Sequence, residues 1–266
     1  MVAPRRRRSA TAASRGHAQP DYTRFLDPNG LRGARIGVAR EKLFGADQHA
    51  DRVVNAAIQE LRRLGAVIVD PANIPHLGEY DGDEFTVLLY DFKADLNAYL
   101  ASRGATAQVH SLADVIAYNE RDRAREMPFF GQEIMTMAQA KGPLTDKAYR
   151  DARAKSLRLA GREGIDAVMT AHRLDAIVAP TGSVPWPIDV LLGDHGVGGS
   201  STPAAVAGYP NITVPAGYAF GLPVGISFIG RAWSEPTLIK LTYAFEQGTR
   251  HRKPPRFLPT ADLSTP

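Results

Sequence analysis

Residues 33–70 read GARIGVAREKLFGADQHADRVVNAAIQELRRLGAVIVD, and this stretch decides the fold. Its first eight residues, 33–40, are mostly small or apolar and predict a short buried strand. From Ala50 onward, apolar residues recur at offsets of 3, 4, 7, 8, 11 and 14, which all lie on one face of a helix. Asp47 is suited to cap that helix at its start, and Gly65 to end it in a left-handed conformation.

A second apolar run, residues 66–70, follows the predicted helix directly. Strand, helix and strand within about forty residues predict two parallel strands of one sheet. Residues 174–180 (LDAIVAP), 211–217 (NITVPAG) and 222–230 (LPVGISFIG) predict further strands, and a helix is expected from Ser234 to about residue 250. The chain is therefore expected to have an α/β fold.

The middle of the chain, residues 80–172, reads as mostly helical. Ser111 is a suitable cap for one of these helices, since Asp114 follows in its first turn. Pro128 and the pair Gly142-Pro143 interrupt the helical pattern. The length allows one large domain or two small ones.

The positive charge of the chain is concentrated at its amino end. The sequence has 32 Lys and Arg against 28 Asp and Glu, but residues 1–20 hold five arginines and no acid. Taking these five away leaves 27 basic residues against 28 acidic ones, so the rest of the chain is nearly neutral. Domains that bind nucleic acid usually carry positive charge on their folded part, so a nucleic-acid partner is not expected. Residues 1–26 are predicted to be a disordered Arg- and Ser-rich leader. A transit peptide and a tail that contacts an anionic surface remain alternatives.

Two absences from the composition limit the function further. The chain has no cysteine, which excludes a disulfide framework, a thiolate nucleophile and a thiolate-ligated metal. No segment approaches the ~18 uninterrupted apolar residues of a membrane-spanning helix, so no membrane partner is expected. A cytoplasmic location is predicted.

Residues 181–202 are rich in Gly, Pro and Ser and are too long for an ordinary connection, which is typical of a functional loop. The string Gly198-Gly199-Ser200-Ser201 admits two interpretations. A serine here is a nucleophile if a base such as His195 reaches it. Alternatively, Ser201 or Thr202 caps a helix that has Pro203 at its first position. Asp189, Asp194 and His195 are too few to indicate a metal site, and none is predicted.

Three strings carry a family resemblance. They are LRGARIGVARE, LDAIVAPTGSVPWPID and SSTPAAVAGYPNITVPAGYAFGLPVGISFIGRAWSEPTLIKLTYAFEQGTR. They resemble the carboxy-terminal half of the amidase signature enzymes, with the peptide amidase type as the nearest match. The similar part covers residues 27–258, which leaves the leader at 1–26 and a tail at 259–266.

The resemblance implies a mixed β-sheet flanked by helices and hydrolysis of a carboxamide to an acid and ammonia or an amine. Family members use a serine nucleophile, a second serine in a cis peptide and a lysine base, without a metal or organic cofactor. The resemblance makes the loop a wall of the pocket for a small-molecule amide. The predicted substrate-binding residues are Thr181, Ser183, Trp186, Asp194, Ser200, Ser201 and Thr202.

No catalytic residue is assigned in this sequence. The family's lysine and its Gly-Gly-Ser-Ser-Gly-Gly-Ser segment lie before the part that this chain resembles, and here Gly198-Gly199-Ser200-Ser201 is followed by Thr202-Pro203. We therefore expect a truncated amidase that is inactive alone and that exposes strand edges and apolar helix faces. The alternatives are a split amidase whose amino-terminal half is a separate chain, a non-catalytic small-molecule-binding protein, and independent catalysis by Ser200 or Ser201.

Overall fold

The structure is a computed structural model that describes residues 12–257 and residue 260. The predicted leader and tail fall in part outside these residues. The chain forms two compact units. We call Gly78–Ser156, with residues 12–16 and Val190–Leu192, the helical unit; the sheet unit comprises His17–Leu77, Leu157–Asp189 and the residues from Gly193 onward. The predicted boundaries at residues 26 and 258 stay predictions.

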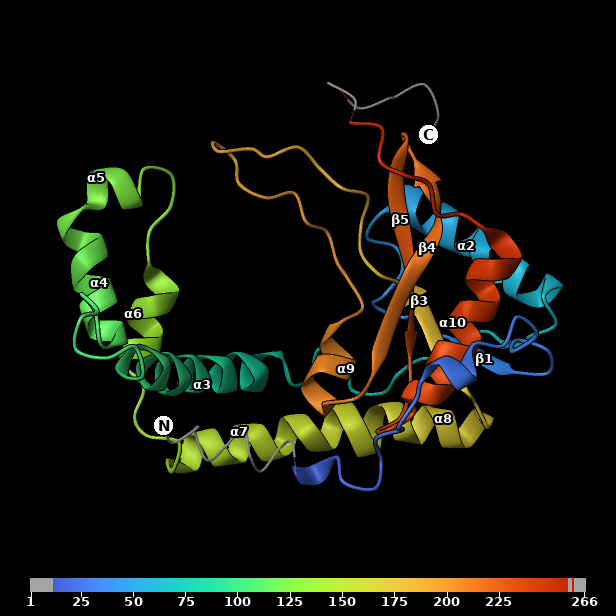
Figure 1. Cartoon of the computed structure of the whole chain (residues 1–266), viewed down its shortest axis with the longest axis horizontal. Helices are drawn as coiled ribbons and strands as arrows, with labels where there is room; N and C mark the ends of the chain where they lie inside the picture. Colours follow the sequence, from blue (N-terminus) through green and yellow to red (C-terminus); the bar gives the residue numbers. More distant parts are fainter. Residues whose placement is uncertain (1–11, 258–259, 261–266) are drawn as a thin grey trace. The chain divides into compact units, whose positions relative to one another are not determined.

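The sheet unit is built on one five-stranded mixed sheet, as predicted (Figure 1). Its strands are β1 (Arg35–Val38), β2 (Val67–Val69), β3 (Ala176–Pro180), β4 (Asn211–Ala219) and β5 (Leu222–Ile229), in the order β2-β1-β3-β5-β4. Strand β1 is parallel to both β2 and β3. Strand β5 is antiparallel to both β3 and β4.

Helix α2 (Gln48–Arg63) joins β1 to β2 and begins where the sequence predicts. The Oδ1 atom of Asp47 accepts hydrogen bonds from the backbone N–H groups of His49 (2.8 Å) and Ala50 (3.3 Å). Gly65 ends the helix with a φ of +97°, a conformation that glycine adopts without strain. The predicted strand–helix–strand unit is thus confirmed.

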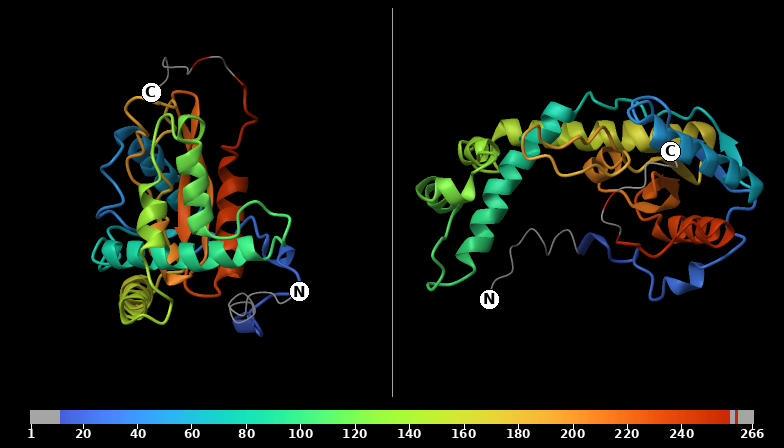
Figure 2. Two further views of the ribbon diagram at one scale, coloured as in Figure 1. Left: turned by 90° about the vertical axis from the view of Figure 1, so that its left-hand side faces the viewer. Right: turned by 90° about the horizontal axis from the view of Figure 1, so that it is seen from above.

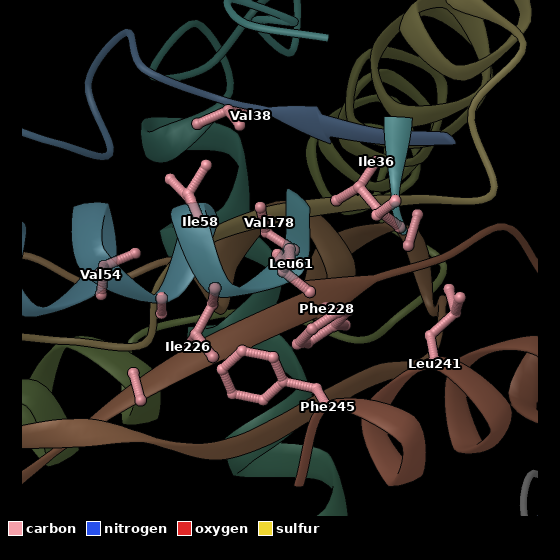
Figure 3. Packing of buried hydrophobic residues seen from close by; sticks show 14 of the residues in the cluster. Ile36, Val38, Val54, Ile58, Leu61, Val178, Ile226, Phe228, Leu241 and Phe245 are labelled. Atoms are coloured by element: carbon pink, nitrogen blue, oxygen red, sulfur yellow. The ribbon is translucent and has the colours of Figure 1, made fainter. Parts of the chain in front are cut away.

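The main core lies between the sheet and two helices, α2 and α10 (Glu235–Thr249). Phe228 of β5 and Phe245 of α10 are fully buried, with ring centroids 6.1 Å apart. Figure 3 shows both rings beside Ile226. Ile177 and Ile229 alternate with core residues along their strands and point to the opposite face of the sheet.

Further helices of the sheet unit precede and follow β3. They are a π-helical segment, Arg158–Ile165, then α8 (Asp166–His172), and α9 (Thr202–Ala207), which packs on the π-helical segment. Asp166, the first residue of α8, connects this helix to two segments farther along the chain. Tyr209 donates a hydrogen bond to its Oδ2 at 2.6 Å, and Arg231 donates one to its Oδ1 at 3.1 Å. Burial first, and then Asp166, raises the pKa of Tyr209 to about 12.

The Tyr209–Asp166 bond gives a first prediction. The variant Tyr209→Phe is expected to lower the free energy of unfolding by about 1–2 kcal/mol, because Asp166 loses a donor in a half-buried position. Urea denaturation measures this change. The matched control is Tyr243→Phe on α10, which should change stability by less than about 0.5 kcal/mol. Equal effects of the two variants would contradict the prediction.

The helical unit holds α3 (Asp81–Ala101), α4 (Leu112–Arg121), α5 (Arg123–Glu126) and α6 (Glu133–Gln139), together with most of α7 (Lys147–Leu157). Ser111 caps α4 as predicted, since its Oγ accepts from the Asp114 N–H at 3.2 Å. A small core of Leu89, Leu112 and Ala138 joins α3, α4 and α6. In the left view of Figure 2, α3 crosses the other green helices of this unit.

Candidate functional site

The loop predicted to be functional, residues 181–202, follows the carboxyl end of β3, and its last residue is the first of α9. Its two ends are tied together by an isolated antiparallel bridge between Gly182 and Gly199. The Ser200 N–H also donates to the Thr181 carbonyl oxygen at 3.3 Å. The loop therefore has a fixed base beside the sheet.

Three hydroxyl groups meet at this base, one from the first residue of the loop and two from β4 and β5. The Thr181 Oγ1 lies 2.6 Å from the Thr213 Oγ1 and 3.0 Å from the Ser227 Oγ. Gly225 makes room for them, because a Cβ at that position would lie 2.8 Å from the Thr181 Oγ1. The predicted site residue Thr181 is thus part of a hydroxyl cluster that fixes where the loop begins.

Asp47, just before α2, also binds the loop by a hydrogen bond. Besides capping α2, its Oδ2 accepts the Val184 N–H at 2.8 Å. Burial works against the charge, but the hydrogen bonds from Val184, His49 and Ala50 outweigh it and lower the pKa of the Asp47 carboxyl. Sequence reasoning found the cap and missed this contact with the loop, because Val184 lies 137 positions further along the chain.

A small cavity of about 20 Å³ opens between the loop base and the start of α2, enough for one water molecule. Its walls include Gly182, Ser183 and Gly198 from the loop, with Lys42 and Asp47 from the segment before α2. The Lys42 side chain is itself engaged, since its ammonium group donates to the Leu77 carbonyl oxygen.

Two serine hydroxyls at the loop base have no hydrogen-bond partner among the described residues. They are the Oγ atoms of Ser183 and Ser200, and both are buried. A buried hydroxyl without a partner costs free energy, so these two groups are suited to meet a polar ligand. No general base among the described residues reaches Ser200, so its arrangement here does not favour independent catalysis.

Trp186 and Asp194 face each other farther along the loop. The Trp186 Nε1 lies 3.5 Å from an Asp194 Oδ1, and the indole ring packs against Gly196, where a Cβ would come within 3.0 Å. His195 pairs with Asp189 at 3.3 Å, so the histidine nearest to the serines in sequence is engaged elsewhere. The predicted substrate-binding residues in the loop thus form two groups. Thr181, Ser183 and Ser200 lie at its base, and Trp186 and Asp194 lie farther along it.

Ser201 and Thr202 begin α9, with Pro203 in its first turn and Gly208 ending it at a φ of +71°. Ser201 stands at the capping position, but its side chain makes no capping hydrogen bond. The interpretation in which Ser201 or Thr202 caps this helix is therefore wrong as to the side chain, because Ser201 makes no capping bond and Thr202 already lies inside the helix. The Ser201 hydroxyl is exposed, because the helix starts from a residue in the right-handed helical conformation rather than an extended one.

A second, open cavity of about 370 Å³ is lined by Arg35, Ala171, His172 and Arg173, away from the loop. Among residues 12–257 and 260, no group of three or more His, Asp or Glu side chains is placed to hold a metal ion. In the same part of the chain, no helix has both the length and the apolar character needed to cross a membrane.

A polar loop at the carboxyl end of a strand, with buried hydroxyls at its base, is the arrangement of an α/β protein that receives a small ligand there. A model of the amidase family matches residues 5–239. The chain belongs to the amidase family.

Three comparisons illustrate the relationship. A protein of Arabidopsis thaliana, described as a probable amidase, is 37% identical over 243 residues, which cover 89% of this chain and 42% of that protein. The peptide amidase of Stenotrophomonas maltophilia is 47% identical, with a TM-score of 0.86 over 97% of this chain and 51% of that one. A peptide amidase crystallised with the competitive inhibitor chymostatin is 50% identical, with a TM-score of 0.85 over 91% and 49%.

The chain spans about half the length of these relatives. The matched residues include parts of both units, since 91% and 97% of this chain is covered.

Proposed function

We propose that this chain forms the carboxy-terminal part of an amidase that hydrolyses the carboxamide group of a peptide amide. The observation that carries the proposal is the 47–50% identity with two peptide amidases across at least 91% of the chain. The activity is proposed for an enzyme in which the catalytic lysine and serines come from polypeptide outside these 266 residues.

In this proposal the loop supplies a wall of the substrate pocket. The partnerless hydroxyls of Ser183 and Ser200 would bind polar groups of the amide, and Trp186 would contact an apolar part of the substrate. Asp47 and Thr181 hold the loop base in place, so they position the wall. The acyl transfer itself would use a serine nucleophile activated by the lysine, as the family resemblance implies.

The catalytic part would belong either to the same polypeptide or to a separate chain, and in the second case the enzyme is a split amidase. A cytoplasmic location is part of the proposal. The second candidate function is binding of a small amide without catalysis, which the two buried hydroxyls at the loop base also support.

A chimaera tests the reaction. In it, the part of the Stenotrophomonas maltophilia peptide amidase that this chain does not match is fused to residues 27–258, and release of ammonia from a peptide amide is measured. We expect turnover by the chimaera and none by the chain alone. A folded chimaera that binds the peptide amide and releases no ammonia would favour the binding function instead.

Ser183 provides a second prediction in that chimaera. The variant Ser183→Ala is expected to lower kcat/KM by about 3- to 10-fold, the effect of one lost neutral hydrogen bond. Ser102→Ala, an exposed serine of the helical unit, is the matched control and should behave as the parent. If the two variants have the same kcat/KM, Ser183 is not in the pocket.

A further inference from the structure

The π-helical segment Arg158–Ile165 is an unusual feature of the sheet unit. The backbone N–H of Asp166 donates to the Gly161 carbonyl oxygen, five residues back, whereas an α-helix uses the fourth. Such segments are rare and are frequently found at functional sites. This one also contains Gly161 and Gly164, and glycine inside a helix is destabilising relative to alanine. A segment that costs stability in two ways indicates a role beyond forming a helix.

Gly164 permits the π-helical geometry. A Cβ at this position would overlap with the carbonyl oxygen of Leu159, five residues earlier in the same segment. A π turn holds one residue more than an α-helical turn, so the residues that follow it are rotated by about 100°. The first of these is Asp166, whose Oδ2 accepts the Tyr209 hydroxyl at 2.6 Å. In an uninterrupted α-helix, Asp166 would therefore point away from Tyr209.

Gly161 makes room for α9, which packs on the π-helical segment (Figure 1). A Cβ at Gly161 would lie 3.3 Å from the Tyr209 Oη and 3.7 Å from the Ala207 Cβ. A larger side chain there would push both residues away. Pro203 and Ala204 of α9 are also buried, so this short helix is held closely against its neighbours.

The position of α9 determines that of Ser200. The carbonyl oxygen of Ser201 accepts the Ala205 N–H at 2.9 Å, so Ser200 directly precedes the first turn of the helix. Ser200 is fully buried, and its N–H donates to the Thr181 carbonyl oxygen at 3.3 Å. Its Oγ has no hydrogen-bond partner among the described residues. A shift of α9 would therefore move the one group at this end of the loop that is suited to meet a polar ligand.

We propose that the π-helical segment is a positioning element of the candidate site, and that Gly161 and Gly164 are positioning residues that act through Ser200. The segment fixes α9, as the bridge between Gly182 and Gly199 fixes the loop base. The inference rests on the proposed function for the ligand that Ser200 meets. The placement of Ser200 itself depends on this chain alone.

Hydrogen–deuterium exchange in the full chain tests the placement. Gly161→Leu is expected to speed exchange of the Ser200 amide at least tenfold, because the new side chain displaces α9 and weakens the bond to Thr181. Gly164→Ala should also speed it, because its Cβ is incompatible with the π turn. The matched control is Ala167→Leu, an exposed position of α8, which should leave exchange at Ser200 unchanged.

The amide of Phe228 in β5 separates positioning from a general loss of stability. Its exchange should be unchanged in both glycine variants, and circular dichroism and thermal melting check that each variant is folded. If one glycine variant does not fold, the other decides. Equal acceleration at Ser200 and Phe228, or no acceleration at Ser200, would overturn the proposal.

The chimaera with the Stenotrophomonas maltophilia peptide amidase tests the consequence for the reaction. Gly161→Leu and Ser200→Ala should each lower kcat/KM by about 3- to 10-fold, and the double variant should lose no more than Ser200→Ala alone. Losses that multiply would show that Gly161 does not act through Ser200. If exchange at Ser200 is faster in Gly161→Leu but neither variant changes kcat/KM, or if the chimaera releases no ammonia, the placement stands and the proposed function is contradicted.

Discussion

Replacing Phe228 by alanine is expected to lower the free energy of unfolding by about 3–5 kcal/mol, as for other buried aromatic side chains. Phe228 is fully buried in β5, opposite Val178 of β3 and against the Phe245 ring. Removing the ring leaves a cavity between the central strands and α10, and those rigid elements cannot collapse to fill it. The loss is comparable with the whole stability of many domains.

Urea denaturation followed by circular dichroism measures the effect of Phe228→Ala. The matched control is Phe257→Ala, because the Phe257 side chain is 90% exposed and its removal should cost less than about 0.5 kcal/mol. The conservative variant Phe228→Leu should keep much of the stability, since it preserves most of the buried apolar volume. If Phe228→Ala unfolds at the same urea concentration as the control, the assignment of this core is wrong.

Replacing Asp47 by alanine is expected to have the second large effect, on stability and on the loop together. The carboxylate accepts the N–H groups of His49, Ala50 and Val184. Loss of a capping side chain costs about 0.5–2 kcal/mol by itself. Here it also releases residue 184, so the amide of Val184 should exchange with solvent deuterium at least tenfold faster.

The matched control for Asp47→Ala is Asp175→Ala. The Asp175 carboxylate likewise accepts a backbone N–H, that of Arg35 at the start of β1, and this bond does not involve the loop. The control variant should destabilise the protein without changing hydrogen exchange at Val184. Equal exchange in the two variants would show that Asp47 does not hold the loop.

The contribution of Asp47 depends on pH in a definite direction. Its folded-state pKa is lowered from the ordinary 3.8 by the backbone hydrogen bonds, against the effect of burial. The stabilisation is therefore complete above the ordinary pKa and is lost as the pH falls through the lowered one. Between pH 7 and pH 3 the stability difference between wild type and Asp47→Ala should shrink, which urea titrations at several pH values measure.

Much of the fold could be predicted because its signals are local. Periodicity and capping residues near one another in sequence located α2, its two strands and α10. The predicted strand at residues 33–40 is longer than β1, because apolar composition does not show where pairing with β2 and β3 stops. The position of β5 between β3 and β4 came only from the structure, since it depends on contacts between distant segments.

The candidate site was predicted less completely. The sequence indicated the loop and its serines through composition, and the family resemblance gave them a role. The contacts that hold the loop, Asp47 with Val184 and Thr181 with Thr213 and Ser227, join residues 32 to 137 positions apart. Nothing in the sequence marks such pairs. The side-chain cap predicted at Ser201 or Thr202 did not form. Serine is a suitable residue type for a cap, but the backbone of Ser201 is helical rather than extended.

The bridge between Gly182 and Gly199 has a consequence for the length of the loop. Because the two ends of the loop are fixed side by side, the intervening residues can be lengthened or shortened without moving the sheet. Each doubling of a flexible loop's length costs only about 0.6 kcal/mol of closure entropy. Residues 185–197 are therefore the part of the loop in which a change of length should least disturb the hydroxyl-bearing base.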